Sequence, residues 1–218
     1  MPVINMLMIE LDIFSDTVCP WCYIGKKRLE NALNKYKNLI IKQTWRPFQL
    51  NPGMPPDGMD RQEYLISKFG SSDAAKTVYE NIYEEGVKEG INFNFDLIEV
   101  TPNSFNSHRL LALAYKADIQ EKVLDDLFES FFLHGKDIGD PNILLQIAIK
   151  HNINAEEFKS YLSDQENIEP LANEAIQAKK MGINSVPTFI VNRQIVINGA
   201  QTSENFELIF EKLKSRIN

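Results

Sequence analysis

The stretch FSDTVCPWCYIGKKRLENAL, residues 14–33, contains the two cysteines of the chain, Cys19 and Cys22, with Pro20 and Trp21 between them. No other thiol occurs among the 218 residues. A chain that places its only thiols three positions apart is expected to use them as a pair. The segments on either side of this stretch predict the fold that presents the pair.

The first fifty residues predict a strand, a helix and a second strand. Residues 8–15 alternate between apolar and acidic side chains, as a half-buried strand does. Apolar residues recur at helical spacing from Cys19 to Tyr36, and IIKQTWRPF, residues 40–48, is rich in residues that favour strands. The order indicates a βαβ unit.

A long helical segment is predicted to follow. QLNPGMPPDGMD, residues 49–60, has three prolines and two glycines and indicates a linker. The periodicity from about residue 60 to 163 is helical, with helix ends predicted at Gly70, Gly90 and Gly135. EKVLDDLFESFFLHG, residues 121–135, is predicted to bury one helical face, and Asp140 with Pro141 predicts the start of a helix over 141–151. A weaker helical pattern covers 155–163.

The C-terminal part predicts a helix, a hairpin and a helix. A helical pattern runs from Glu166 to Met181, apolar runs at 188–191 and 194–197 flank Asn192 and Arg193, and a last helix is predicted over 203–216. With the βαβ unit, these elements indicate an α/β protein with the thioredoxin fold (βαβ plus αββα) interrupted by an all-helical domain. The expected division is 1–52 and 164–218 for the thioredoxin-like domain, and 53–163 for the helical insertion.

Composition and charge limit the class of protein. The chain is 44% hydrophobic and 24% charged, with a formal net charge of −7, which argues against nucleic acid as a partner. No segment is long and apolar enough to predict a membrane partner. No Lys or Arg precedes Lys26, so the N-terminus lacks the features of a signal peptide, and we expect a cytoplasmic protein. In the cytoplasm, a CxxC pair is more often catalytic or metal-binding than a structural disulfide.

The pair suits thiol–disulfide exchange. If a helix begins at Cys19, the unpaired amides of its first turn stabilise a thiolate there, and Cys22 lies one turn further on the same face. Cys19 is then the nucleophile and Cys22 the thiol that resolves the mixed disulfide, while Pro20 fits the first turn. The alternatives are a zinc pair and inert buried thiols. Zinc is disfavoured because no second CxxC occurs and the three histidines are widely spaced, at positions 108, 134 and 151.

Four segments carry a family resemblance that covers about residues 8–210. They are FSDTVCPWCYIGKKRLE, WRPFQLNPGMPPDG, TPNSFNSHRLLALA and GINSVPTFIVN. In this order they resemble the DsbA-like thioredoxin superfamily, and within it the cytosolic FrnE-type oxidoreductases. The relatives of that branch include 2-hydroxychromene-2-carboxylate isomerases and kappa-class glutathione transferases.

The resemblance implies a substrate-binding loop near the C-terminus. It implies that the Val186–Pro187 peptide is cis and faces the cysteines, with a backbone edge that pairs with substrate. The residues implied as substrate-facing are Pro20, Trp21, Ser185, Val186, Pro187 and Thr188. The residues alone leave another interpretation open, in which Pro187 only begins a strand.

Five further residues are candidates for a pocket beside the cysteines: Asp16, Tyr23, Asn103, His108 and Arg109. The resemblance places TPNSFNSHRL at the border of the active-site cleft, whereas the residues also fit a helix start capped at Thr101. Asp16 either exchanges a proton with the pair, disfavours the thiolate electrostatically, or serves as a turn or cap residue. Tyr23 is either a substrate contact or a side chain packed against the insertion.

These observations predict a thiol–disulfide oxidoreductase that needs no metal or organic cofactor. Its partners would be protein or small-molecule thiols and disulfides, with glutathione as a candidate co-substrate. One alternative is a glutathione-dependent isomerase or transferase, although those relatives typically carry serine where this chain has Cys19. Another is a redox-switched binding or chaperone module whose working surface is the insertion.

Overall fold

The computed structural model describes residues 8–36 and 40–215 and contains the predicted thioredoxin-like fold. Its central sheet has the order β2-β1-β5-β6. The strand β1 pairs in parallel with β2 and antiparallel with β5, and β5 pairs antiparallel with β6. The strands are β1 (Met8–Ser15), β2 (Ile40–Pro47), β5 (Thr188–Val191) and β6 (Ile195–Asn198). Residue 216, the last of the helix predicted over 203–216, lies outside the described residues.

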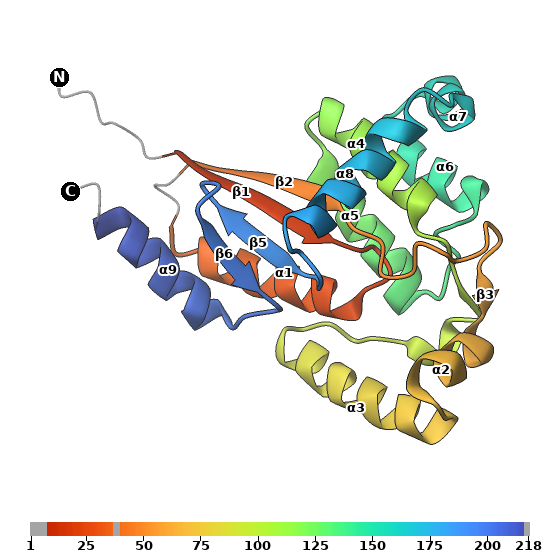
Figure 1. Cartoon of the computed structure of the whole chain (residues 1–218), viewed down its shortest axis with the longest axis horizontal. Coiled ribbons are helices and arrows are strands. Elements are labelled where there is room, and N and C mark those ends of the chain that lie inside the picture. Colours follow the sequence, from red (N-terminus) through yellow and green to blue (C-terminus); the bar gives the residue numbers. More distant parts are fainter. Residues whose placement is uncertain (1–7, 37–39, 216–218) are drawn as a thin grey trace.

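Helices cover the two faces of this sheet (Figure 1). Ile9, Leu11 and Ile13 of β1 are buried in the main core, on the face that α1 (Pro20–Leu33) and α9 (Ser203–Ser215) cover. Phe14 points to the other face, where a smaller core includes Ala178 of α8 (Ile168–Lys180). The alternation predicted for residues 8–15 therefore separates two cores, because successive strand side chains point to opposite faces.

The regular structure between β2 and α8 is mainly helical, as predicted. It also contains a two-residue antiparallel ladder, β3 with β4, that the sequence analysis did not predict. The elements are β3 (Met59–Asp60), α2 (Arg61–Phe69), α3 (Ser72–Lys88), the short helix η1 (Phe95–Leu97), β4 (Val100–Thr101), α4 (Phe105–Lys116), α5 (Gln120–Phe128), the π-helical turn η2 (Glu129–Leu133), α6 (Pro141–Lys150) and α7 (Ala155–Ser163).

Local signals place several helix ends correctly. The Asp140 carboxylate accepts a hydrogen bond from Asn142 N, and Pro141 begins α6. Gly70, Gly90 and Gly135 all have positive φ and follow helical segments. At Gly135 the need for glycine is also steric, since a Cβ would lie 2.2 Å from the Leu97 carbonyl oxygen.

The predicted helix over residues 121–135 changes its pitch halfway. The helix α5 passes into the π-helical turn η2, where His134 N donates to Glu129 O across five residues. The wider turn accommodates Phe128, Phe131 and Phe132, which are all buried in the main core. The apolar pattern gave the buried face correctly but carried no signal of the extra residue in the turn.

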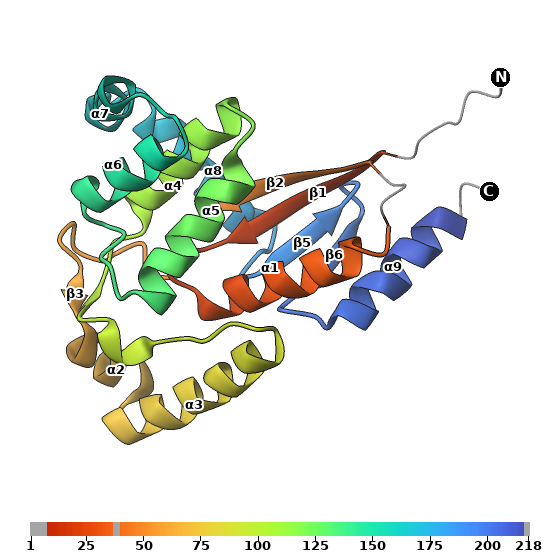
Figure 2. The same ribbon diagram turned by 180° about the vertical axis from the view of Figure 1, so that it is seen from behind.

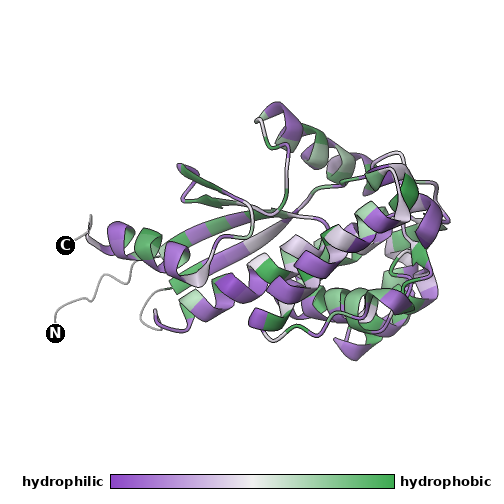
Figure 3. Ribbon diagram, turned by 90° about the horizontal axis from the view of Figure 1, so that it is seen from below, coloured by the Kyte–Doolittle hydropathy of each residue, from purple (hydrophilic) through white to green (hydrophobic). Residues whose placement is uncertain are grey.

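The insertion and the sheet share this main core. Apolar residues of α1 and β1 belong to the same buried cluster as those of α4, α5 and α6. Gln120 of α5 satisfies the backbone of the edge strand β2 at Trp45. Its side-chain amide accepts a hydrogen bond from Trp45 N at 2.9 Å and donates one to Trp45 O at 2.9 Å. Green and purple segments alternate along the helices in Figure 3, as amphipathic packing requires. Among the described residues, no helix has the length and apolarity needed to cross a membrane.

Candidate functional site

The cysteine pair occupies the start of α1. Cys19 is the N-cap residue, with φ −98° and ψ 112°, and Pro20 follows in the first turn. Cys19 N donates to Asp16 O at 3.0 Å, and Cys22 N donates to Cys19 O at 3.0 Å. This turn brings the two thiols together at the helix end where unpaired N–H groups favour negative charge.

The two thiols, both reduced, differ in their surroundings. Cys19 is 4% exposed and Cys22 is fully buried. Burial raises the pKa of Cys22 well above its ordinary value, and the adjacent Cys19 raises it further. Hydrogen bonding by the Ser15 hydroxyl and the Asp16 backbone opposes that rise in the pKa. Cys22 therefore stays protonated at pH values at which an ordinary thiol ionises.

Ser15 was not among the predicted site residues. It is 4% exposed at the end of β1, and its Oγ makes no aligned hydrogen bond to another oxygen or nitrogen. Ser15 nevertheless lies near enough to the Cys22 thiol to oppose the rise in the pKa of that thiol. The available sequence signal was its position at the end of a strand that leads directly into the cysteine turn.

The loop before β5 lies opposite Cys19. The Cys19 Sγ is 3.9 Å from the Val186 carbonyl oxygen, and the Val186–Pro187 peptide is cis. Ser185 is exposed and Val186 is half-buried, whereas Pro187 is buried. Thr188 does not fit the expected substrate contact through its side chain: it is 1% exposed, and its hydroxyl donates to Ser185 O at 2.8 Å. Its hydroxyl fixes the loop instead.

Gly25 of α1 allows this loop to approach the helix. A Cβ at Gly25 would lie 2.9 Å from Pro187 Cγ, 3.4 Å from Phe189 Cζ and 3.5 Å from Ala200 Cα. A glycine inside a helix normally weakens it, so its presence indicates a packing requirement. The sequence signal was a glycine three residues after Cys22, but its partner is 162 residues away.

Asp16 and His108 meet behind the cysteine turn. Asp16 is fully buried, and its Oδ2 accepts from Leu50 N at 2.7 Å. His108 Nε2 lies 3.4 Å from Asp16 Oδ1, but the atoms are not aligned as a hydrogen bond. Asp16 thus acts as a turn residue and also brings a carboxylate to the start of the site. Within residues 8–36 and 40–215, no three His, Cys, Asp or Glu side chains are grouped as metal ligands.

Tyr23 packs against the insertion rather than facing a pocket. Its ring stacks on Phe128 with centroids 5.0 Å apart and meets Phe93 edge to face at 6.0 Å. Burial raises the pKa of the Tyr23 phenol, and nearby carboxylates add to the rise. The interpretation of Tyr23 as a substrate contact is corrected by this packing. Trp21 is half-buried against the main core.

Asn103 and Arg109 have structural partners away from the thiols. Asn103 Nδ2 donates to Met54 O at 2.7 Å, and its Oδ1 accepts from Phe105 N at 2.9 Å, so Asn103 rather than Thr101 binds the amide at the start of α4. Arg109 donates to Tyr161 O and Asp164 O, and the bonds hold the connection from α7 to α8. Arg109 is corrected from a pocket residue to one that fixes this connection.

Two buried cations on α1 were missed by the sequence analysis. Lys26 is 1% exposed and pairs with Glu30 and with Asp125 of α5, the latter at 2.7 Å. The sequence gave no sign that Lys26 and Arg28 are buried, because a run of charged residues on a helix usually faces solvent.

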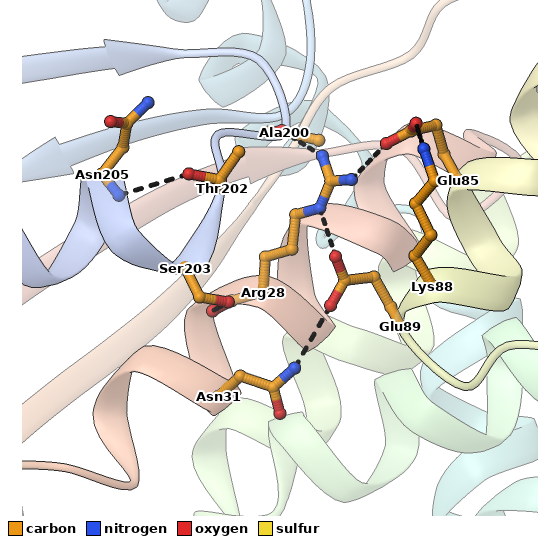
Figure 4. Close-up of polar contacts among 9 residues, drawn as sticks. All are labelled: Arg28, Asn31, Glu85, Lys88, Glu89, Ala200, Thr202, Ser203 and Asn205. Carbon is orange, nitrogen blue, oxygen red and sulfur yellow. Dashed lines mark hydrogen bonds and ion pairs between the residues drawn. The ribbon is translucent and has the colours of Figure 1, made fainter.

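Arg28 joins three parts of the chain (Figure 4). Its Nε donates to Glu89 at 2.7 Å, its Nη1 donates to Ala200 O at 2.8 Å, and its Nη2 pairs with Glu85. Its own carbonyl oxygen accepts from Ser203 Oγ at 3.0 Å. Helix α1 is thereby tied both to α3 of the insertion and to the segment leading into α9.

A dithiol at the start of the first helix of a thioredoxin-like fold defines a class of oxidoreductases. Residues 10–211 match the family model of the DSBA-like thioredoxin domain. The chain belongs to this family. The predicted resemblance to the DsbA-like superfamily is therefore confirmed.

Two relatives from Bacillus subtilis (strain 168) extend over most of the chain. The uncharacterized protein YwbO is 25% identical over 203 residues, which cover 92% of this chain and 95% of YwbO. The ClpXP adapter protein SpxH is 24% identical over 221 residues, which cover 94% of this chain and 68% of SpxH.

Solved structures share the fold. A probable DsbA oxidoreductase from Streptomyces coelicolor superposes with a TM-score of 0.85 at 28% identity, covering 94% of this chain and 89% of that one. A 2-hydroxychromene-2-carboxylate isomerase gives 0.69 at 15% identity, covering 95% of each chain. The cytosolic disulfide reductase DsbM from Pseudomonas aeruginosa with GSH gives 0.65 at 16% identity, covering 94% of this chain and 99% of DsbM. At these identities the last two matches support the fold alone.

Proposed function

We propose that the protein is a FrnE-type thiol–disulfide oxidoreductase that acts through Cys19 and Cys22. The observation that carries the proposal is the Cys19 sulfur at the start of α1, 3.9 Å from the Val186 carbonyl oxygen. This arrangement gives the nucleophile a helix end that favours a thiolate and a neighbouring backbone edge where an extended substrate can bind. Ser185 and Val186 supply that edge.

The reaction that we propose has two exchanges. The Cys19 thiolate attacks a substrate disulfide, forms a mixed disulfide and releases one substrate thiolate. Cys22 then loses its proton and attacks the Cys19 sulfur, which releases the second substrate thiol and leaves a Cys19–Cys22 disulfide. The substrate is reduced by two electrons and the enzyme is oxidised by two. The Ser15 hydroxyl would stabilise the Cys22 thiolate in the second exchange.

Glutathione is the thiol that we propose to return the oxidised pair to the dithiol, in the cytoplasm. Support comes from the fold shared with DsbM, a cytosolic disulfide reductase whose structure contains GSH. Two glutathione molecules would be oxidised for each Cys19–Cys22 disulfide that is reduced, so electrons balance without a metal or organic cofactor.

The test is insulin-disulfide reduction with reduced glutathione as the electron source. Wild type should accelerate the reaction and Cys19→Ser should not. Cys22→Ser should accumulate a mixed disulfide on Cys19, visible on a non-reducing gel, because the resolving thiol is absent. Reduction by Cys19→Ser at the wild-type rate would exclude the proposed nucleophile.

A second candidate function is a redox-switched adapter. Its support is the likeness to the ClpXP adapter protein SpxH over 94% of this chain. The two candidates differ in turnover, since an adapter would bind a client without catalysing disulfide exchange. An inactive wild type in the insulin assay, combined with a client that the dithiol and disulfide forms of wild type capture to different extents, would favour the adapter.

A further inference from the structure

A cavity of about 620 Å³ lies within the insertion, between α2, α3 and the segment that carries η1. Figure 2 shows α2 and α3 on the side of α1 that faces away from the sheet. The size is that of a small-molecule site. None of the candidate redox residues lines this cavity. The residues that matter most are Arg61, Ala75, Tyr79, Tyr83, Phe93 and Phe95.

Arg61 is a buried cation in the cavity wall. It is 6% exposed at the start of α2. Among the described residues it forms no ion pair, and the one aligned hydrogen bond of its side chain runs from Nη1 to Thr101 Oγ1 at 3.1 Å. The side chain lines the cavity, and no acceptor among the described residues is aligned with its Nε or Nη2. A buried guanidinium in a cavity wall, with donors beyond its one aligned hydrogen bond, is suited to an anion.

Four aromatic side chains line the cavity together with Arg61. The Arg61 guanidinium lies over the Tyr79 ring, 4.9 Å from its centroid. Tyr83 is 44% exposed, whereas Phe93 and Phe95 stack on each other with centroids 4.8 Å apart. Flat ring faces beside a fixed guanidinium favour a ligand that has a planar apolar body and an acidic group.

Exposed charges around the opening limit the charge of that ligand. Lys76 and Glu80 lie 4.0 Å apart and are largely in solvent, and Glu84 and Asp96 are also exposed. Three carboxylates against one lysine at the opening would repel a polyanion more strongly than a monoanion. Screening by salt weakens this repulsion but leaves its sign unchanged.

We propose that this cavity binds an aromatic monocarboxylate, with the carboxylate on the Arg61 guanidinium and the ring between the aromatic side chains. The proposal is independent of the redox function, because the cavity and the cysteine pair share no residue.

The test uses 1-naphthoate as the probe and isothermal titration calorimetry on the full chain. Wild type should bind at a dissociation constant of about 1 mM or lower, as the usual free energy per atom of small ligands gives for this probe. The neutral analogue 1-naphthamide should bind at least about tenfold more weakly, because it makes no charge-assisted bond with Arg61.

Three variants separate the parts of the site. Arg61→Gln should lose about tenfold in naphthoate affinity and should bind naphthoate and naphthamide alike. Tyr83→Ala removes an exposed ring, is expected to fold normally, and should weaken both probes. Lys116→Gln is the matched control, because Lys116 also lies over a tyrosine ring, that of Tyr161 at 5.2 Å, but lines a different cavity. It should bind both probes as wild type does.

Absence of saturable naphthoate binding to wild type would overturn the proposal. Equal affinity for the acid and the amide would overturn the role of Arg61 in it. If circular dichroism shows that Arg61→Gln is unfolded, the proposal is tested instead by the affinities of wild type and Tyr83→Ala for the two probes. Undiminished binding of both probes to Tyr83→Ala would then place them elsewhere and refute this site.

Discussion

Replacing Gly25 with alanine should weaken both the fold and the proposed exchange reaction. Alanine favours a helix interior over glycine by about 0.5–1 kcal/mol. The added methyl group would lie 2.9 Å from Pro187 Cγ, in a rigid ring, and 3.5 Å from the Ala200 backbone. Overpacking of this kind costs about 1–3 kcal/mol. The net expectation is a loss of about 0.5–2 kcal/mol in the free energy of unfolding.

The same contact predicts the effect on activity. Ordinary van der Waals contact begins at 3.4 Å, so the loop must move by at least about 0.5 Å from a helix that carries the cysteines. Since a misplacement of about 1 Å can cost about 100-fold in rate, this shift should slow insulin reduction by about tenfold.

The measurements are urea unfolding of the reduced protein and the initial rate of insulin reduction. Gly53→Ala is the matched control, since a Cβ there has no atom within 4 Å and should leave stability and rate close to wild type. A Gly25→Ala variant that gains stability by the full helix propensity and keeps the wild-type rate would refute the packing argument.

Three further predictions follow from the buried groups of α1. Limited iodoacetamide should label Cys19 before Cys22 in the native protein, because Cys22 is fully buried and burial raises its pKa; mass spectrometry that finds Cys22 labelled first would reverse the assigned roles. Because the pKa of Cys22 is raised in the folded protein, Cys22 stabilises the reduced protein below the ordinary thiol pKa of about 8.5, and this stabilisation is lost as the pH rises above that value. The urea midpoint should therefore fall more steeply above that pH in wild type than in Cys22→Ala. Arg28→Ala should lower the free energy of unfolding by about 2–3 kcal/mol, because Glu89, whose side chain is only 15% exposed, loses its cationic partner and keeps the neutral donor Asn31. An equal loss in the exposed control Arg193→Ala would contradict this reasoning.

Local patterns accounted for most of the fold. The alternation of Ile9, Leu11 and Ile13 predicted β1, and Asp140 with Pro141 predicted the start of α6, because both signals act within a few residues. Boundaries that depend on neighbouring elements shifted: α1 ends at Leu33 rather than Tyr36, and β6 begins at Ile195 rather than Gln194. The ladder between β3 and β4 joins segments some forty residues apart, and each of its strands is too short to leave a periodic pattern.

The site was predictable to the extent that its motif is local. Cys19 and Cys22 lie within one helical turn, so their juxtaposition followed from spacing alone. The contact of Asp16 with His108 spans 92 residues, and that of Gly25 with Pro187 spans 162, so each depends on how the finished fold packs. Tyr23 left two interpretations open for the same reason, since an aromatic residue on a helix next to an active site fits both substrate contact and core packing.

Helix α1 links the candidate redox pair to the insertion. Nine of its fourteen residues are buried, and they include two of its three basic residues, Lys26 and Arg28. Removal of residues 53–163 would take Asp125 from Lys26, both carboxylates from Arg28 and the stacked Phe128 from Tyr23. The division into 1–52 with 164–218 and 53–163, which we propose from the sequence, therefore describes the order of the chain rather than two units that fold alone. Because the sheet covers one side of α1 and the insertion packs against it as well, the first turn of α1, and with it Cys19, has a fixed position relative to Val186. Such fixed geometry is what an exchange reaction between two sulfurs requires.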